Sequence, residues 1–370
     1  MTIVDTLDAF DKLCDDLRTV GPTLNDPVVE AAYGFEFLCN SLQTVSPFLV
    51  NNLRDQLKTL HPVLQRKVDK IGRMGASSRV LEAPRFAPSM AKAALNRMMH
   101  DPVPAVIEGA CAATEAVKTW TPQWFGEHYG SYELPLAKGR SQAETGTIAE
   151  VVDDIVSGRE RGKYIHNVAN LFNKYPELEA KLELERLLQY VAPARFFGTQ
   201  IFMGGAKTGT SWHCASGLNF FINVYGEKRW YMSHPKHSPW MYGTLHESGT
   251  FAHSPTDHST PQADQRKEFP LYSYVPIVEI LLKPGDVLVV PPWWWHAITN
   301  MTPATIAVAV RWNSMKGGAV TEPNPLYRLA QGQMPNMKKF EEQSGNDPDF
   351  RIIDEFVRDT YNTGIKSDIG

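Results

Sequence analysis

Hydrophobic residues in the first 75 positions recur every three or four residues, the period of an α-helix with one buried face. This spacing predicts a layer of helices that packs on the rest of the protein. Prolines 84 and 88 then predict an extended connector over residues 79–88, and Ser89 is placed to cap a short helix that ends near His100. The recurring positions are Val4, Leu7, Phe10, Leu13, Cys14, Leu17, Leu38, Leu42, Leu53 and Leu57.

Between residues 102 and 190 the pattern predicts one strand followed by helices. Residues 102–107 are apolar apart from their prolines and favour a strand, whereas 120–129, 147–156 and 176–190 favour helices. The pattern at 147–156 is the clearest, because its apolar residues share one helical face and Gly158 follows its end.

From residue 196 to 312 the hydrophobic period changes to that of short strands. Runs of β-branched and aromatic residues alternate here with glycine and proline turns. Several strands without intervening helices predict a barrel or jelly roll. The predicted strands are Phe196–Met203, Leu218–Val224, Arg229–Met232, Val275–Leu282, Val287–Val290 and Thr305–Trp312.

Two segments lie outside this strand pattern. Residues 233–274 form a long polar insertion, the kind of loop that often serves a binding site. The chain becomes helical again after Gly318, with one apolar face that we expect to pack on the barrel or on a second copy in a homodimer. That face consists of Ile352, Ile353, Phe356 and Val357.

Composition narrows the class of protein. With 370 residues and 43% hydrophobic content, the chain can bury a large core, and its net charge of −4 gives no electrostatic case for nucleic acid. No apolar run is long enough to predict a membrane span, and the first ten residues do not resemble a signal peptide. The scattered cysteines, without metal-finger spacing, predict reduced thiols and a cytoplasmic protein. They are Cys14, Cys39, Cys111 and Cys214.

Two short motifs at the ends of the strand region carry candidate chemistry. Trp212-His213-Cys214-Ala215 opens the region and Pro291-Pro292-Trp293-Trp294-Trp295-His296 closes it. Two such histidines make a reasonable facial pair for Fe(II), whose third ligand is usually a carboxylate two residues after the first histidine. Here that position is Ala215. Because strand neighbours point to opposite faces, we expect His213 and Ala215 to point together and Cys214 to point away, which argues against a thiolate ligand.

These motifs, with others in the same order, resemble the JmjC-related cupin hydroxylases of the factor-inhibiting-HIF type. The resemblance covers residues 102–312. Each motif alone is weakly specific, and their order and spacing together are specific. The other matching segments are Pro102–Gly109, Trp120–Gly130, Thr210–His213, Asn219–Phe221, Gly226–Arg229, Ser254-Pro255, Phe269-Pro270 and Pro284–Asp286.

The resemblance implies an α+β protein built on a double-stranded β-helix (cupin or jelly roll). Together with the helical patterns on either side, this predicts a helical N-terminal region (1–100), a catalytic domain (101–315) and a C-terminal helical segment (316–370). Fe(II), 2-oxoglutarate and O2 would be the cofactor and cosubstrates.

The same resemblance implies the roles of individual residues. His213 and His296 fall on the two iron ligands, and Lys228 falls on the lysine that binds the distal carboxylate of 2-oxoglutarate. Thr210 falls on the hydroxyl that assists this lysine, and Asn219 falls on a polar residue of the same pocket. A buried cation suits the free carboxylate of a chelated diacid.

The chain departs from the family pattern at two places. Ala215 replaces the acidic ligand, and Val310-Arg311-Trp312 stands where the family often has Asn-aromatic-Trp. The second change puts the family's hydrogen-bond network around the cosubstrate in question.

Three explanations for Ala215 remain open. An open coordination position would admit chloride, as in the radical halogenases that the His-x-Ala pattern resembles, or a substrate carboxylate or amine. A third ligand would otherwise come from the insertion, with hydroxylation retained. A binding module without catalysis is the third explanation. The candidate ligands of the insertion are Asp257, Asp264, Glu268, His246, His253 and His258.

We favour the first explanation, since the rest of the cosubstrate site is retained. The substrate would then be a small metabolite or amino acid, whereas hydroxylase relatives favour a protein side chain.

Overall fold

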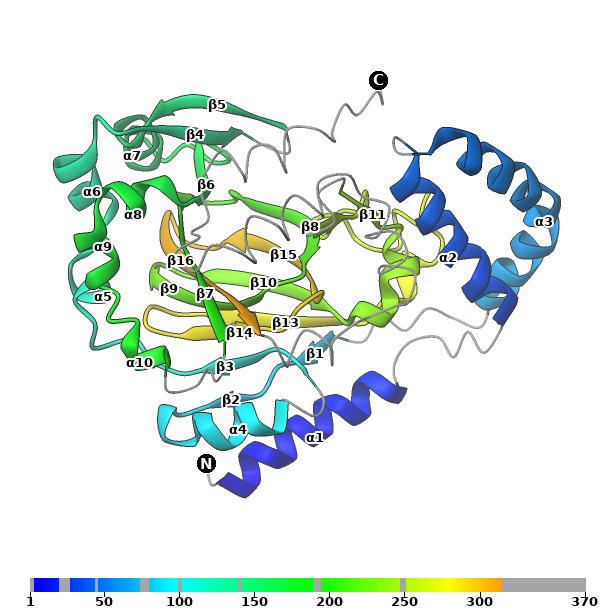
Figure 1. The fold of residues 1–370 in the computed structure, drawn as a ribbon, viewed down its shortest axis with the longest axis horizontal. Coiled ribbons are helices and arrows are strands. Elements are labelled where there is room, and N and C mark those ends of the chain that lie inside the picture. The colour runs from blue at the N-terminus through cyan, green and yellow to red at the C-terminus, as the bar shows by residue number, and fades with distance from the viewer. Residues whose placement is uncertain are drawn as a thin grey trace.

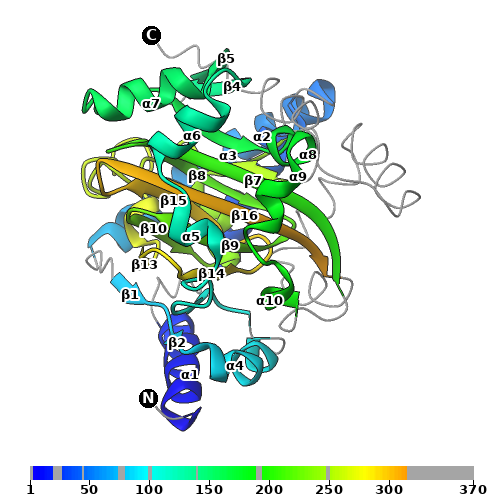
Figure 2. The same cartoon turned by 90° about the vertical axis from the view of Figure 1, so that its left-hand side faces the viewer.

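The computed structural model describes residues 3–19, 27–43, 46–73, 80–98, 102–138, 141–188, 194–246 and 251–314. Two β-sheets face each other at its centre, and helices flank them (Figures 1 and 2). This arrangement is the jelly roll of a double-stranded β-helix, so the predicted α+β fold is confirmed. The predicted C-terminal helical segment and its apolar face lie outside the described residues.

The first sheet has seven strands in the order β1-β13-β10-β15-β8-β12-β11. Its long central strands run antiparallel to their neighbours, and the short β1 adds in parallel to β13. The strands are β1 (Val80–Glu82), β13 (Ile277–Leu282), β10 (Lys228–Ser233), β15 (Trp295–Asn300), β8 (Gly209–Ala215), β12 (Phe251–His253) and β11 (Thr244–Leu245).

The second sheet has nine strands in the order β2-β3-β14-β9-β16-β7-β6-β4-β5. They are β2 (Arg85–Phe86), β3 (Ala105–Ile107), β14 (Val287–Val290), β9 (Leu218–Tyr225), β16 (Ala304–Ser314), β7 (Ala194–Gly205), β6 (Tyr164–Val168), β4 (Glu133–Lys138) and β5 (Ser141–Thr147).

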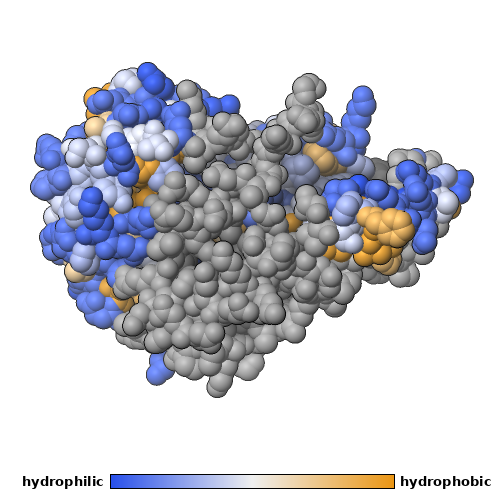
Figure 3. Space-filling model, turned by 45° about the horizontal axis from the view of Figure 1, so that its top comes forward, coloured by the Kyte–Doolittle hydropathy of each residue, from blue (hydrophilic) through white to orange (hydrophobic). Residues whose placement is uncertain are grey.

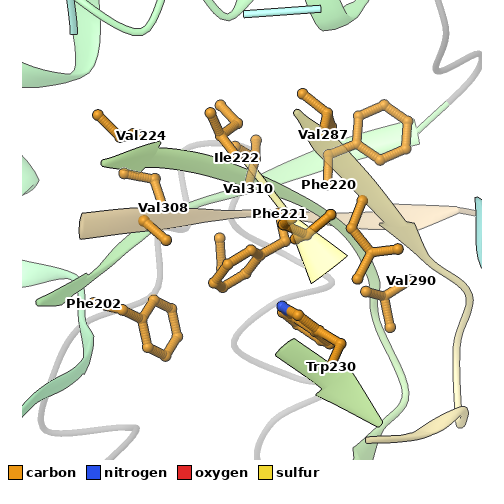
Figure 4. Packing of buried hydrophobic residues seen from close by; sticks show 14 of the residues in the cluster. Phe202, Phe220, Phe221, Ile222, Val224, Trp230, Val287, Val290, Val308 and Val310 are labelled. Carbon is orange, nitrogen blue, oxygen red and sulfur yellow. The ribbon is translucent and has the colours of Figure 1, made fainter. Parts of the chain in front are cut away.

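Aromatic and β-branched side chains fill the space between the sheets (Figure 4). Phe221 of β9 meets Trp230 of β10 edge to face, with ring centroids 4.7 Å apart, so the two sheets touch directly at this point. Phe202 of β7 packs on Phe221 from the same sheet. These contacts hold the two sheets face to face.

Three groups of helices surround the sheets (Figures 1 and 2). The predicted N-terminal helices are α1 (Ile3–Thr19), α2 (Pro27–Leu42) and α3 (Pro47–Arg73). The short elements on the nine-stranded side are α5 (Glu115–Thr119), α6 (Pro122–Tyr129), α7 (Ile148–Val156), α8 (Asn170–Lys174), α9 (Pro176–Ala180) and α10 (Glu185–Leu188). The remaining elements are η1 (Pro88–Met90), α4 (Ala91–Met98), η2 (Pro235–Met241) and η3 (Tyr272–Tyr274).

The α2–α3 pair packs on β11 and η2, at one end of the seven-stranded sheet (Figure 1). Phe37 and Cys39 of α2 are buried in one cluster with Trp212, Cys214 and Trp295 from β8 and β15. This cluster forms the outer layer behind the strands that carry the two motif histidines. The same helical pair also presents hydrophobic side chains to solvent, visible as orange atoms at one end of Figure 3. The exposed ones are Phe35, Phe48, Leu49 and Val63.

Two predicted elements differ from the observed ones. The single helix expected over 176–190 is divided into α9 and α10, because Glu183 adopts a left-handed backbone angle (φ 49°) that no helix continues through. The connector at 79–88 contributes β1 and β2 to the sheets.

The insertion at 233–274 was expected to be a polar loop, yet much of it is buried structure. Trp240, Met241 and Tyr272 belong to the outer hydrophobic cluster, and β11 and β12 extend the seven-stranded sheet. Alternating hydrophobic residues were too widely spaced in this segment to predict such short strands.

All four cysteines are buried free thiols. Among the described helices, none combines the length and the apolar character needed to cross a bilayer.

Candidate functional site

The two motif histidines lie directly opposite each other on neighbouring strands. His213 of β8 pairs in register with His296 of β15, and their ring centroids are 4.1 Å apart. Nδ1 of His213 contacts the backbone oxygen of Ser211 at 2.9 Å, and Nδ1 of His296 contacts that of Trp294 at 2.8 Å. A carbonyl oxygen only accepts, so each Nδ1 carries the proton and donates. Each Nε2 is left with the lone pair that a metal needs.

Burial keeps both imidazoles neutral. It lowers the pKa of His213 to about 4 and the pKa of His296 well below its ordinary value. Neutral imidazole is the form that ligates a metal, so the pair is ready to bind one at physiological pH.

Strand alternation places Ala215 with the histidines and Cys214 behind them, as predicted. Cys214 and Trp212 are fully buried in the outer cluster against α2. Ala215 lies opposite Phe251 of β12, so a methyl group and an aromatic ring occupy the place where the family has its acid. Cys214 therefore faces away from the pair and is no replacement ligand.

Three rows of side chains cross the inner face of the seven-stranded sheet. The histidine row consists of Met232, His296, His213 and His253; the tryptophan row of Trp230, Ile298 and Thr210; the lysine row of Lys228 and Asn300. Successive rows lie two residues apart along β10, about 7 Å.

A β-bulge places Thr210 on this inner face. Thr210 and His213 are three residues apart, so strict alternation would put them on opposite faces. The register with β15 shifts between His296 and Ile298, which gives β8 one extra residue and returns Thr210 to the side of His213. The pocket position that the resemblance implied for Thr210 thus depends on an irregularity that the sequence pattern does not reveal.

Lys228 is completely buried at the far end of the rows. Its ammonium donates to Oδ1 of Asn300 at 2.6 Å and to Oγ1 of Thr305 at 3.0 Å, both neutral oxygens. It also lies 5.8 Å from the ring centroid of Tyr164, which lines the pocket. Burial lowers the pKa of Lys228 to about 7. An interior cation with these neutral partners is well suited to an anionic ligand.

A pocket lies between the two sheets beside the histidine row. Three of its lining atoms are buried without a hydrogen-bond partner among the described residues: Oγ1 of Thr210, Oδ1 of Asn219 and Nε1 of Trp230. Buried polar atoms are nearly always paired, so unpaired ones that converge on one pocket indicate a polar ligand. The lining residues are Tyr164, His166, Asn167, Phe202, Thr210, His213, Asn219, Phe221, Trp230, His296, Ile298 and Arg311.

The carboxylates of the insertion do not reach this pocket. Asp257 accepts from Ser259 and Thr260 within its own turn, and Asp264 and Glu268 are exposed. None of the described residues that line the pocket is acidic.

The insertion histidines occupy different places. His258 contacts Oγ1 of Thr299 and lies beside Trp212, on the outer side of the sheet. His246 stacks on Phe251. His253 alone stands in the histidine row, opposite His213. Within the described ranges, no three histidine, cysteine or acidic side chains are arranged to hold a metal together.

Several lining residues had no assigned role in the sequence. Tyr164, His166 and Asn167 come from β6, which was not predicted, and Arg311 was noted only as a departure from the family pattern. The signal for Arg311 was present, since a charged residue interrupts the apolar run of β16 next to Trp312.

Comparison with known proteins gives a family for this arrangement. Residues 91–317 match the cupin-like domain family. An HSPB1-associated protein 1 homolog of Danio rerio is 31% identical over 112 residues, which are 29% of this chain and 24% of that protein. The JmjC domain-containing protein D of Dictyostelium discoideum is 28% identical over 101 residues, 27% of this chain and 22% of that protein.

A third relative, lysine-specific demethylase JMJ21 of Arabidopsis thaliana, is 24% identical over 225 residues. These cover 55% of this chain and 22% of that protein, so the chain spans less than a quarter of each of these relatives. JmjC-related cupins include Fe(II)- and 2-oxoglutarate-dependent oxygenases. With a match over more than half its length and the corresponding two-sheet fold, the chain belongs to the cupin-like domain family, among its JmjC-related members.

Proposed function

We propose that this protein is an Fe(II)- and 2-oxoglutarate-dependent oxidative enzyme with a two-histidine iron site. The observation that carries the proposal is the inner face of the seven-stranded sheet. There, two neutral histidines with available Nε2 atoms share a surface with a buried lysine whose described partners are neutral. Its substrate would be a small metabolite or an amino acid.

The residues fit both groups. His213 and His296 would hold the iron, and Lys228 would bind the distal carboxylate of 2-oxoglutarate. The histidine and lysine rows are four residues apart along β10, about 13 Å between Cα atoms, a span that an extended lysine and a five-carbon diacid fill together. Two polar residues would form hydrogen bonds with 2-oxoglutarate: Thr210, in the row between the histidines and the lysine, and Asn219, from the opposite sheet.

When bound, iron and 2-oxoglutarate would supply the activation of O2, with release of succinate and CO2. The chain's own residues orient and shield the reactants. The backbone carbonyls of Ser211 and Trp294 hold the histidine rings at Nδ1, so both present Nε2. Trp230 stacks on His296 with ring centroids 5.4 Å apart and, with Phe221, excludes water from one side of the pocket.

Ala215 would leave one coordination position for a ligand that the chain does not supply. Two neutral imidazoles and a dianionic cosubstrate leave Fe(II) formally neutral, so an added anion meets no net repulsion. Chloride at this position would lead to halogenation. A substrate carboxylate or amine there would lead to desaturation, cyclisation or another substrate-ligated oxidation.

The in-register position of His253 supports a second candidate. A rotation of its side chain towards the pair would give a three-histidine site, and the protein would then be a hydroxylase whose third ligand comes from the insertion. Substitution His253→Ala separates the two, because it weakens iron binding only in the three-histidine case.

An anaerobic titration with Fe(II) and 2-oxoglutarate, followed by the optical metal-to-ligand band and by calorimetry, tests the proposal. We expect the band in the wild type. A shift of the band on adding chloride favours halogenation, and a shift only with substrate favours direct substrate ligation. No band and no cosubstrate binding would leave a non-catalytic binding module.

Substitution Ala215→Asp tests the open position. We expect iron to bind about tenfold more tightly, as one carboxylate ligand is added. The native product should be replaced by simple hydroxylation. Ala215→Asn is the matched neutral control, and an unchanged product in Ala215→Asp would show that the missing acid does not direct the chemistry.

A further inference from the structure

The ring nitrogen of Trp230 is a buried hydrogen-bond donor in the lining of the pocket. Trp230 is 1% exposed, and its Nε1 has no partner among the described residues. In Figure 4 this nitrogen, drawn in blue, lies at the end of the side chain that points away from β10 into the interior. A buried N–H without a partner destabilises the ligand-free protein. Its position beside a pocket therefore indicates that a ligand atom satisfies it.

The ring of Trp230 lies at the metal end of the pocket. Trp230 pairs with Ile298 of β15, yet its ring stacks on His296, the diagonal neighbour, with 5.4 Å between ring centroids and 26° between ring planes. Phe221 of the opposite sheet contacts the same ring edge to face at 4.7 Å. These two contacts fix the ring, so the N–H is held beside a histidine that would ligate iron.

The chemistry of the indole restricts the ligand atom that faces it. An indole N–H donates and never accepts, so the atom opposite it must be an acceptor. The hydroxyl of Thr210 and the amide of Asn219 can each donate or accept, and they set no such requirement. In the proposed enzyme the 2-oxo acid group of 2-oxoglutarate would chelate iron at this end of the pocket. Its oxygens accept hydrogen bonds that their negative charge strengthens.

We infer that the Nε1–H of Trp230 donates to an oxygen of the iron-chelating 2-oxo acid group, so that Trp230 positions this end of the cosubstrate. The inference rests on the proposed function and deepens it. Lys228 holds the distal carboxylate by its charge, and Trp230 holds the 2-oxo acid by a hydrogen bond. The seven-stranded sheet thus recognises 2-oxoglutarate at two separate points, one at each end of the molecule.

Pyruvate separates the two ends, because it has the 2-oxo acid group and lacks the distal carboxylate. The affinities of 2-oxoglutarate and pyruvate are measured on the full chain under anaerobic conditions with saturating Fe(II), by the optical metal-to-ligand band. Trp230→Phe keeps an aromatic ring and removes the N–H. We expect it to weaken both acids by about tenfold or more, the loss typical of a charged hydrogen bond. Lys228→Met should weaken 2-oxoglutarate and leave pyruvate within about threefold of the wild type.

Trp120→Phe is the matched control. The Nε1 of Trp120 is also buried without a partner among the described residues, and its ring packs on Phe125 and Phe172, away from the pocket lining. Both affinities should stay within about threefold of the wild type in this variant. Should Trp230→Phe fold poorly, site-specific replacement of Trp230 by benzothienylalanine keeps the ring shape and exchanges the N–H for sulfur. It is expected to give the same loss.

Four results overturn the inference. They are equal affinities in the wild type and Trp230→Phe, a loss in Trp230→Phe confined to 2-oxoglutarate, a loss of the same size in Trp120→Phe, and a wild-type band with 2-oxoglutarate but none with pyruvate. The second result would place the N–H at the distal carboxylate. Failure of the proposed function is distinguishable, because no band would then form with either acid, and both proposals would be overturned together.

Discussion

The histidine row and the lysine row differ in how much of a binding site the chain itself supplies. At the histidine row two ligands remain, and the third position holds the methyl group of Ala215. At the lysine row the cation is buried and held by two oxygens, as a complete anion site requires. If the protein had lost its function, unselected substitutions would be expected in both rows. A difference confined to one position favours a changed coordination site over a decayed one.

Removal of a histidine should have the largest effect and should leave the lysine row intact. We expect His213→Ala to weaken Fe(II) binding by more than about 100-fold, above the range usual for losing an outer-shell partner of a metal ligand. Anaerobic iron titration measures this. His258→Ala, on the outer side of the sheet, is the control, and similar losses in both variants would contradict the assigned faces.

Removal of the Lys228 ammonium should weaken cosubstrate binding and leave the histidine row intact. We expect Lys228→Met to weaken 2-oxoglutarate binding by about 100-fold, since truncating one partner of a buried charge pair costs about 2–5 kcal/mol. Iron affinity without cosubstrate should not change. Calorimetric titrations with Fe(II) and with 2-oxoglutarate measure the two affinities. Tight 2-oxoglutarate binding in this variant would show that the cosubstrate site lies elsewhere.

Titration of Lys228 should make both the free energy of unfolding and the affinity for 2-oxoglutarate depend on pH. The folded metal-free protein releases the Lys228 proton near pH 7, whereas an unfolded chain keeps it to about pH 10.5. Between these values the unfolded state binds more protons, so this group makes the free energy of unfolding rise with pH. Cosubstrate binding needs the charged amine, and its affinity should fall by up to about tenfold per unit above pH 7. Denaturant melts and calorimetry follow the two trends, and Lys228→Met should lack both contributions.

The smallest expected effect on ligands comes from the outer face of β8. Cys214→Ser places a hydroxyl in the apolar layer behind the histidines and should lower the free energy of unfolding by about 1–3 kcal/mol. Iron affinity should be unchanged. A selective loss of iron binding, with stability retained, would return Cys214 to the list of ligands.

The sequence predicted the strands β7, β9, β10, β13, β14 and β16 from runs of β-branched and aromatic residues, but the predicted strands did not include β8 and β15, which carry the two histidines. It also predicted that Cys214 points away from His213, and the structure confirms this. Alternation does not encode backbone irregularities. The bulge beside His296, the left-handed Asn167 and the left-handed Glu183 are such irregularities. Alternation alone therefore did not predict the pocket face of Thr210, the role of β6 or the division of 176–190.

The resemblance to a family directed attention to the positions that the family uses. Lys228, Thr210 and Asn219 were found in this way, while Arg311 was noted only as a departure. Its pocket position follows from the pairing of β16 with β9, which brings together residues far apart in the chain.

The bulge in β8 has an evolutionary consequence. It is a single extra residue between Thr210 and His213, equivalent to one codon. Deletion of Ser211 would leave Thr210 two residues before His213, so strict alternation alone would keep both side chains on the inner face. The hydroxyl and the pair of histidines can therefore be presented by either spacing, with a bulge when the spacing is three residues and without one when it is two.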